Sequence, residues 1–432
     1  MKKILIMFIA VLMIGVWCVG VAVAATEAEK RAAIDAGLAY LATQQQANGA
    51  FGTGGVDYQV AQTGAALLSF LEEKENWGAN AAAYQTAVNN GINYLLGQVS
   101  VVPIAAQPAG NPDGDANGVG VKFYPDGANI RDTYVTGLAL PAIAMTGTPN
   151  AVVTVGPLAG RTDGSGAGGA WTYRDVVQNT IDYFAFGQSD PSTGVYAGGW
   201  RYYANYGNSD QSTTQWPIIA SLYAQRMGVT TPAFVTTELA KWVNYVQNMN
   251  PASSYYGAAG YTGPAPSGYG EVNETGALLI MQKFLGWSTG NARVDAALNF
   301  LNTHWQDTAS GWDGNFGNPY AMWAVYKGLE LMIGLNDMGT PITNLHDNPG
   351  DINNPNHGWN WWEDYCEWLV NNQLGDGSWA GHYNWGPYLA TPWYINILAA
   401  TRIVETVPEP VTMLLLGLGL VGLAGVRRRF HK

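Results

Sequence analysis

The sequence predicts an all-α fold in which six helical hairpins close into a ring, an (α/α)6 toroid, between two terminal sorting segments. Six related units follow one another along the chain, and each joins a helix that ends in aromatic residues to a Gln and a Gly-rich loop. The helix after each loop is apolar on most of its faces, whereas the helix before it is amphipathic. The composition agrees with dense helix packing, because 54 Gly and 17 Trp accompany only 12% charged residues.

The first helix of each unit is predicted from its closing motif: an aromatic residue, an aliphatic or second aromatic residue, and then a Gln. These motifs lie in segments 37–46, 91–98, 181–188, 242–247, 298–306 and 368–373. We expect the Gln amide to bond the backbone of the following loop. The Trp or Phe of that loop is expected to stack on the end of the first helix.

The second helices are predicted to begin near Tyr58, Asp132, Asp210, Asn273, Asn318 and Tyr388. Residues that can cap a helix stand at five of these starts, namely Asp57, Asp132, Asp210, Asn273 and Asn318. Because a helix that is apolar all round is buried, the second helices should form the inner layer. A closed ring is favoured over an open solenoid, whose ends would need polar capping repeats.

Residues 1–25 are predicted to be a cleavable signal peptide. Lys2 and Lys3 give a positive start, segment 4–23 is almost wholly apolar, and Ala22-Val23-Ala24 has the small residues that signal peptidase accepts. The chain turns polar directly afterwards. This favours a secretory signal over the alternative of an uncleaved N-terminal anchor.

Residues 407–432 form a second sorting segment. Pro408, Glu409 and Pro410 precede an apolar helix predicted at 411–426, and Arg427, Arg428 and Arg429 follow it. Sixteen helical residues span about 24 Å, less than the roughly 30 Å hydrocarbon core, and the basic cluster holds the C-terminus in the cytoplasm.

This order of elements resembles the PEP-CTERM sorting tail. The resemblance implies export across the inner membrane, transient anchoring by the transmembrane helix, and processing by an exosortase into the cell envelope or the extracellular space. An ordinary tail anchor is the alternative interpretation, in which the tail is retained.

The repeats between the two sorting segments, residues 26–406 with an insertion at 99–130, resemble those of squalene/hopene cyclases and protein prenyltransferase β-subunits. Segments 37–51 and 369–379 carry the resemblance most clearly. It implies an (α/α)6 toroid, but it does not transfer the chemistry. Triterpene cyclases protonate their substrate with an Asp-x-Asp-Asp motif, and this chain contains no Asp-Asp pair.

Prenyltransferases hold zinc with an Asp-x-Cys pair and a distant His, and Asp364, Cys366 and His382 offer the same residue types. The repeat pattern places Asp364 and Cys366 on a first, outer helix, whereas the ligands of that family come from inner helices. We therefore expect a buried structural Cys and a loop His rather than a zinc site, and no cofactor is assigned.

The mouth of the ring is the predicted functional site, because all six inner helices should begin there and direct the positive ends of their dipoles toward a shared opening. The candidates are Arg131, Asp132, Tyr134, Asp210, Gln215, Glu274, Tyr320, Trp323, Tyr388 and Trp393. Such a mix of carboxylates and aromatic rings suits sugar stacking and hydroxyl bonding. The leading hypothesis is a binding or scaffold module at the cell surface, with carbohydrate as a candidate ligand.

Two enzymatic hypotheses remain beside it. Paired carboxylates at the mouth could serve a polysaccharide lyase or hydrolase. The other enzymatic hypothesis is a diverged terpenoid-cyclase-like enzyme that lacks the Asp-x-Asp-Asp motif.

The insertion contains a candidate for weak calcium binding. Asp113, Asp115 and Asn117 alternate ahead of Gly118, as in the first half of an EF-hand loop, but Tyr124 takes the place of the bidentate Glu. A plain Gly-containing turn is the alternative.

The charge and the cysteine count restrict partners and covalent bonds. The whole chain has a formal net charge of −12, and six of its 20 basic residues lie in the terminal segments. A nucleic-acid partner is therefore not expected, because phosphate binding needs a basic surface. Cys18 lies in the signal segment, so Cys366 alone remains and no intramolecular disulfide can form.

Overall fold

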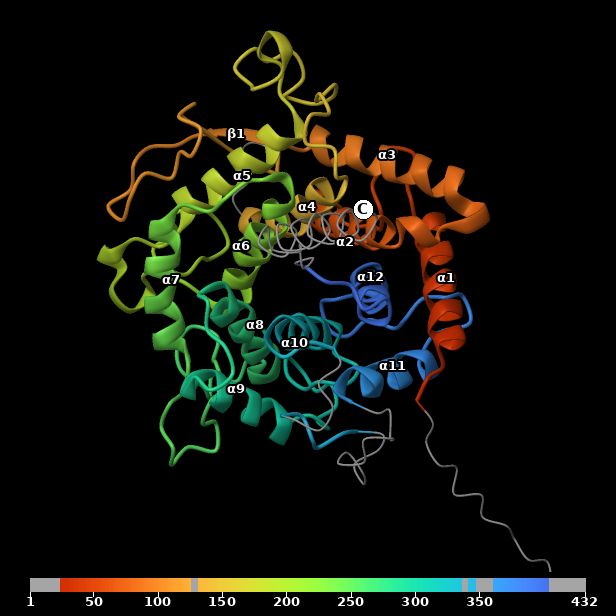
Figure 1. Ribbon diagram of the computed structural model, residues 1–432, viewed down its shortest axis with the longest axis vertical. Coiled ribbons are helices and arrows are strands. Elements are labelled where there is room, and N and C mark those ends of the chain that lie inside the picture. The colour runs from red at the N-terminus through yellow and green to blue at the C-terminus, as the bar shows by residue number, and fades with distance from the viewer. Residues whose placement is uncertain (1–23, 126–130, 336–340, 347–359, 404–432) are drawn as a thin grey trace, which may run out of the picture.

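A computed structural model describes residues 24–125, 131–335, 341–346 and 360–403, and twelve α-helices in these ranges form two concentric layers (Figure 1). The inner layer holds α2 (Val56–Glu72), α4 (Asp132–Met145), α6 (Gln211–Ala224), α8 (Glu271–Phe284), α10 (Pro319–Met332) and α12 (Pro387–Leu398). The outer layer holds α1 (Glu27–Thr43), α3 (Ala81–Gly97), α5 (Tyr173–Gly187), α7 (Ala233–Val246), α9 (Ala292–Thr303) and α11 (Trp361–Asn371).

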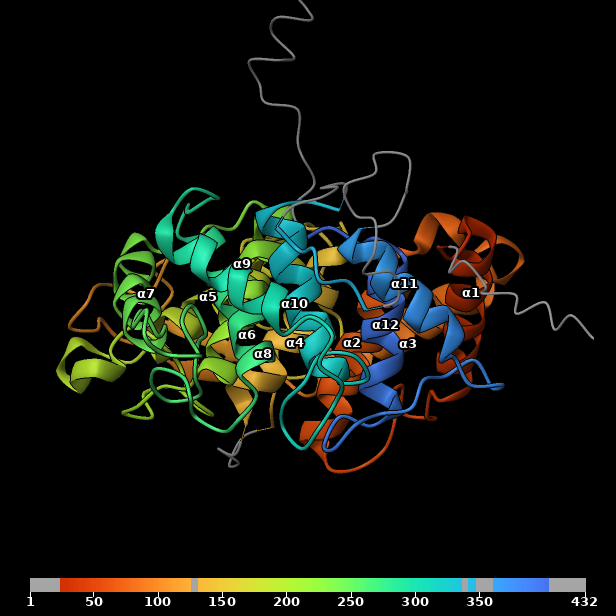
Figure 2. The same ribbon diagram turned by 90° about the horizontal axis from the view of Figure 1, so that it is seen from below.

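The ring is closed. Each inner helix packs against the next one along the chain, and α12 returns to pack against both α2 and α1. Seen edge-on, the ring is a short, broad barrel, with long connecting loops below it (Figure 2). The helical hairpins predicted from the repeats are therefore confirmed, and the open solenoid is not what forms.

The prediction of a purely helical domain needs one correction. The insertion at 99–130 contributes two short antiparallel strands, β1 (Ser100–Pro103) and β2 (Val119–Lys122), with Ser100 opposite Lys122 and Pro103 opposite Val119. Strand β2 packs against α5. Short stretches of β-branched residues were overlooked in the sequence because the repeat pattern does not extend into the insertion.

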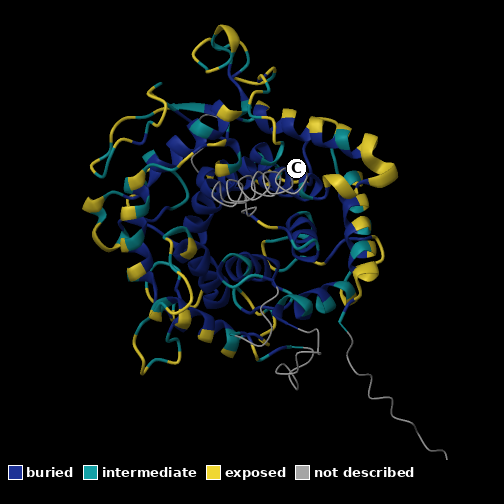
Figure 3. Ribbon diagram, viewed as in Figure 1, coloured by how far each residue is buried: buried dark blue, intermediate teal, exposed yellow. Residues whose placement is uncertain are grey.

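Burial separates the two layers as the apolar pattern predicts. Every residue of α6 is buried, whereas α7 buries little more than the face that carries Val235, Leu239 and Trp242. Figure 3 shows the same contrast around the whole ring, with buried inner helices and exposed residues on the outer ones. The hydrophobic core therefore lies between the layers and inside the inner ring.

Two of the five predicted helix caps are confirmed. Asp210 accepts a hydrogen bond from the Thr213 backbone at 2.7 Å, and Asn318 accepts one from Ala321 at 3.3 Å. The predicted caps Asp57 and Asn273 were wrong, since α2 begins after Gly55 and α8 begins after Gly270.

Asp132 is the third incorrect cap. It is the first residue of α4 rather than its cap, and its carboxylate pairs with Lys122 at 3.1 Å and accepts a hydrogen bond from Tyr183 at 2.9 Å. Both contacts use Asp132 Oδ2 and tie strand β2 and helix α5 to the start of α4.

The Gln of the closing motif clamps neighbouring repeats together. The Nε2 atoms of Gln45, Gln188, Gln247 and Gln373 donate to the loop carbonyls of Gly49, Gly198, Gly257 and Gly377 at 2.8–3.1 Å. The same atoms donate at 2.7–3.0 Å to Ala87, Val235, Arg293 and Ala33 of the next outer helix. The predicted bond to the loop is confirmed, and the last clamp joins the sixth repeat to the first.

In two repeats the loop Trp contacts the end of the outer helix, as predicted, but through a hydrogen bond of its indole N–H. The indole Nε1 atoms of Trp200 and Trp379 donate to Phe184 and Leu369 near the ends of α5 and α11, each at 2.8 Å. The fifth repeat departs from the pattern, because Gln306 bonds Leu345 and Asn344 instead of its own loop.

None of the helices in the described ranges is long and apolar enough to cross a membrane. The predicted signal peptide (1–25) and the predicted helix at 411–426 fall in segments 1–23 and 404–432, which lie outside the described residues apart from Ala24 and Ala25.

Candidate functional site

A cavity of about 430 Å³ lies at the mouth of the barrel. The first turns of all six inner helices reach it, because Tyr58, Val135, Ser212, Asn273, Tyr320 and Leu389 all line it. The inner helices therefore begin at one end of the barrel, as expected, and their N-termini surround a shared opening. The volume lies in the range of small-ligand pockets, about 300–1,000 Å³.

Five of the ten residues proposed from the sequence line this cavity: Arg131, Tyr134, Glu274, Tyr320 and Trp393. The other five do not. Asp132 faces the insertion, as described above, and Tyr388 lies against Gly52 in the first loop.

The side chains of the remaining three predicted residues make contacts inside the barrel. Asp210 caps α6, and the Gln215 amide donates to Ser212 at 3.2 Å and to the Tyr320 hydroxyl. Trp323 is 1% exposed and stacks on Trp216 with ring centres 5.3 Å apart. The sequence places these residues near the correct end of each helix but does not say which way they point.

The interior below the cavity is filled by what we call the tryptophan plug: Trp216, Trp323 and Trp393. Trp216 stacks on Trp323 and also on Trp393, 6.2 Å away, with an interplanar angle of 19° in both pairs. All three are at most 2% exposed. The three indoles therefore pack together inside the inner ring, and Trp393 also lines the base of the cavity.

A second set of aromatic side chains lines the cavity, and we call it the aromatic rim: Tyr202, Tyr261, Trp312 and Trp385 come from loops, and Tyr58 lies in the first turn of α2. Trp385 lies flat on Tyr320, with ring centres 4.6 Å apart and an interplanar angle of 4°, and Trp312 meets Trp385 edge-on at 5.7 Å. All rim residues line the cavity and keep part of their surface exposed.

The four loop residues of the rim are not among the site residues predicted from the sequence, because that prediction covers only the starts of the inner helices. Trp312 was assigned to the loop of the fifth repeat, where a Trp was expected to stack on the outer helix. A signal was nevertheless present, since the loop before α12 carries a second Trp, Trp385, beyond the repeat motif that ends at Trp379.

Charged side chains stand among the rim aromatics. Arg131 lies 3.6 Å from the Asp57 carboxylate and donates to the Tyr58 hydroxyl at 3.3 Å. Arg201 lies over the rings of Tyr202 and Tyr261, and these two hydroxyls are 2.8 Å apart. The wall of the cavity thus alternates ring faces with hydrogen-bonding groups.

Glu274 is the carboxyl group at the base of the cavity. Burial raises its pKa well above the usual 4.5, and the charges of Asp210 and Glu271 act in the same direction. The raised pKa favours the neutral acid. Within the described residues, Glu274 Oε2 and the neighbouring Asn273 Oδ1 are buried oxygens without a hydrogen-bond partner. Buried polar atoms are normally satisfied, so these two call for a donor from a ligand or water.

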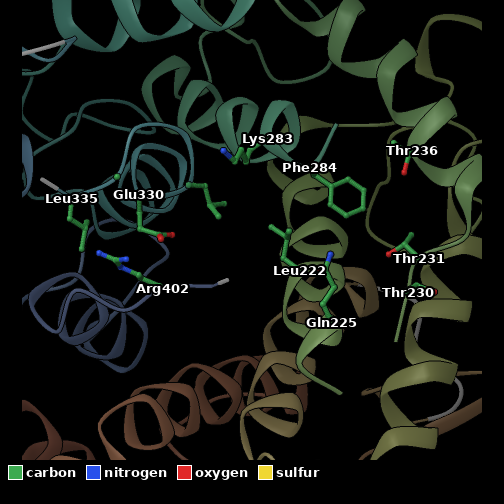
Figure 4. A pocket seen from close by; sticks show the side chains of 12 residues that line it. Leu222, Gln225, Thr230, Thr231, Thr236, Lys283, Phe284, Glu330, Leu335 and Arg402 are labelled. Carbon is green, nitrogen blue, oxygen red and sulfur yellow. The ribbon is translucent and has the colours of Figure 1, made fainter. Parts of the chain in front are cut away.

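A second cavity, of about 610 Å³, lies at the opposite end of the barrel, where the inner helices finish (Figure 4). Leu222, Phe284 and Glu330 line it, together with Lys283 and Arg402. Although it is larger, its lining contains a single aromatic ring and no stacked pair. Glu330 Oε2 there also lacks a partner within the described residues, but stacked aromatic faces line only the mouth among these two cavities, so we take the mouth as the candidate site.

The residues considered for zinc lie apart from both cavities. Cys366 is buried on the outer helix α11, as the repeat pattern predicted. The Asp364 carboxylate accepts hydrogen bonds from Trp305 and from the His346 backbone, each at 2.7 Å. His382 lies 2.9 Å from the Gly311 carbonyl, in a loop.

Comparison with known proteins identifies the C-terminal tail. Residues 406–429 match the PEP-CTERM protein-sorting motif. This confirms the sorting motif predicted from Pro408, Glu409, Pro410 and the arginine cluster. The chain is an exported protein, transiently anchored in the membrane and processed by an exosortase, that reaches the envelope or the extracellular space.

No curated protein is significantly similar in sequence. Among solved structures, the apo form of MstE, a type II terpene cyclase from Scytonema, is 11% identical, with 87% of this chain and 98% of that chain covered and a TM-score of 0.49.

Proposed function

We propose that this exported protein is a binding module that takes a saccharide segment into the mouth cavity and holds it at the cell surface. The observation that supports the proposal best is the lining of the cavity. Flat aromatic faces stand beside buried oxygens that have no partner in the described structure.

Sugar rings match both features. The stacked Tyr320 and Trp385 supply an aromatic surface of the kind on which the C–H face of a pyranose packs. Asn273 Oδ1 can accept a hydrogen bond from a sugar hydroxyl, and the Glu274 carboxyl, whose raised pKa favours the protonated form, can both donate and accept. Arg131 and Arg201 add donors at the rim.

An isoprenoid ligand fits the same lining less well. The lining includes two guanidinium groups, from Arg131 and Arg201, and the Asp57 carboxyl, and an apolar chain would remove water from them without replacing their hydrogen bonds. The chain also lacks the Asp-x-Asp-Asp motif. We therefore expect no polycyclic product when the protein is incubated with squalene.

The position of the tail orients the mouth. The described body ends at Ile403, after α12, at the end of the barrel opposite the mouth, and the sorting motif begins three residues later. While the protein is tethered, the mouth should therefore face away from the membrane. This direction suits capture of extracellular polysaccharide.

The mature protein proposed here comprises residues 26–406 or begins one residue earlier, with signal peptidase removing the N-terminal segment and exosortase the tail with its helix at 411–426. Ala25 is 5% exposed and packs into the core, and Thr26 forms a capping box with Glu29 at the start of α1. Both residues are thus part of the folded domain. Intact-mass measurement of protein isolated from the envelope tests the two cleavages, and a chain that keeps both apolar segments contradicts them.

A second candidate function is hydrolysis or elimination at a bound polysaccharide. The raised pKa of Glu274 favours it, because a general acid must hold its proton until it reacts. Asp57 is the other carboxyl group of the lining. Glycan cleavage that is lost in Glu274→Gln while binding remains would establish this enzyme, and intact glycan after long incubation would exclude it.

A glycan array probed with the mature domain tests the main proposal. We expect retention of one related set of surface polysaccharide fragments, and its loss when Trp385 is replaced by Ala. An array without any bound glycan would contradict the proposal.

A further inference from the structure

We propose that Asp113, Asp115 and Asp182 form a calcium site that fastens the insertion to the outer helix α5. The sequence suggested only the loop residues Asp113, Asp115 and Asn117. The structure adds Asp182, which lies on α5, 67 residues beyond Asp115 in the chain.

The three carboxylates are spaced for one ion. One oxygen from each lies within 4.8 Å of the other two. Because Ca²⁺–O distances are about 2.3–2.6 Å, ligands on opposite sides of an ion are about 4.6–5.2 Å apart. A single calcium ion can therefore contact all three, and Asp182 supplies the carboxylate that the loop lacks at its twelfth position.

The buried carboxylate of Asp182 points to a ligand. It is fully buried, its Oδ1 accepts from Gln178 at 2.9 Å, and its Oδ2 has no partner in the part of the chain that the structure describes. No salt bridge joins Asp113, Asp115 or Asp182 to a basic residue within the described ranges. An unpaired buried carboxylate is costly, and a bound cation would offset that cost.

The loop is held in place for binding. Gly118 donates its backbone N–H to Asp113 at 2.8 Å, and Asn179 of α5 donates to Asp115 at 3.1 Å. Asn117, the third predicted ligand, here donates its amide to Asp115 and to Asn179 at 3.1 and 2.9 Å. Its role in this geometry is to tie the loop to α5, while Asp182 provides the third oxygen.

Gly114 explains how the loop approaches α5 so closely. A Cβ at this position would lie 2.6 Å from Gln178 Nε2 and 3.0 Å from Asp182 Oδ1. A larger residue would have to displace the Gln178 amide, so the glycine favours this close approach.

The donor set selects the ion. Three carboxylates and no nitrogen or sulfur ligand favour a hard cation, and the exposed side of Asp115 leaves room for the waters and irregular geometry that calcium accepts. With three carboxylates and no bidentate Glu, we expect a dissociation constant of about 10⁻⁴–10⁻³ M, as in extracellular modules.

Thermal unfolding of the mature domain with calcium chloride or with EDTA tests the proposal. We expect Tm to rise saturably with calcium, with a midpoint in the millimolar range or below, and to rise less with magnesium chloride. An unchanged Tm at 10-fold excess over the expected constant, or a larger rise with magnesium, would overturn the assignment.

Variants separate the site from a general salt effect. Asp182→Asn should abolish the calcium-dependent rise, and Asp115→Asn, on the exposed loop, should do the same without altering the buried side of the site. Asp190→Asn, which removes a carboxylate just after α5, is the matched control and should keep the rise. A calcium response that persists in Asp115→Asn and Asp182→Asn would refute the site.

Discussion

The tryptophan plug and the aromatic rim both consist of aromatic side chains, but the two sets serve different purposes. Trp216, Trp323 and Trp393 stack on one another inside the inner ring and are buried almost completely. Trp312 and Trp385 come from loops, meet fewer neighbours and remain half-exposed. The plug closes the barrel and supports the base of the cavity, whereas the rim leaves ring faces available to a ligand.

Tyr320 lies at the boundary between these two layers. Its ring carries Trp385 of the rim, and its hydroxyl bonds Ser212 and Tyr134 at 2.8 and 2.7 Å among the buried residues. The comparison teaches that aromatic content by itself does not mark a binding site in this fold. The depth of the ring in the barrel decides, because Trp200 and Trp379 come from loops and are buried, whereas Tyr58 lies on an inner helix and is exposed.

The plug should give the largest effect on stability. Replacing Trp323 by Ala removes a buried indole and leaves a cavity, so we expect a loss of about 3–5 kcal/mol in the free energy of unfolding, measured by urea denaturation. Trp287→Ala is the control, since Trp287 is half-buried beyond the end of α8. Equal, small losses in both variants would show that the plug does not support the barrel.

The Tyr320→Phe variant tests where the boundary between the plug and the rim lies. The variant keeps the ring under Trp385 but leaves the partners of the hydroxyl unsatisfied, at a cost of about 1–3 kcal/mol of unfolding free energy. Saccharide affinity should change little in titration calorimetry. If affinity falls sharply while stability is kept, the hydroxyl belongs to the binding surface and the boundary lies deeper.

Glu274→Gln should change how stability depends on pH. Because the pKa of Glu274 is raised in the folded protein, its contribution to stability is fully present below the unfolded-chain pKa near 4.5 and is lost as the pH rises through the folded pKa. The Gln variant should therefore gain stability relative to the unmodified protein above that pH, by at most about 1.4 kcal/mol per pH unit.

Glu75 is exposed, and Glu75→Gln is the control. Its curve of unfolding free energy against pH should run parallel to that of the unmodified protein over the same pH range. Parallel curves for Glu274→Gln as well would mean that Glu274 ionises in its cavity as freely as it does in water.

Much of the ring could be predicted from the sequence, because its determinants are local. The period of apolar residues identifies buried helices, and the Gln motif marks the end of each outer helix. Even the clamps were partly predictable, as Gln373 shows: its bond to the loop lies within four residues, but its bond to Ala33 needs the ring to close.

The site was predicted only in part, because its remaining determinants are not local. Trp323 and Tyr320 are three residues apart on α10, yet one belongs to the plug and the other lines the cavity. Trp385 reaches the mouth through the path of a Gly-rich loop, and Asp182 meets Asp115 across the insertion. No periodicity records these long-range contacts.

The central claim is that the rim binds a saccharide, and calorimetric titration of Trp385→Ala with a glycan retained on the array tests it most directly. We expect a loss of about 2 kcal/mol in binding free energy, roughly 30-fold in affinity, with Tm unchanged. Trp287→Ala, at the other end of the barrel, should bind like the unmodified protein. Undiminished affinity in Trp385→Ala, or a loss matched by Trp287→Ala, would contradict the account.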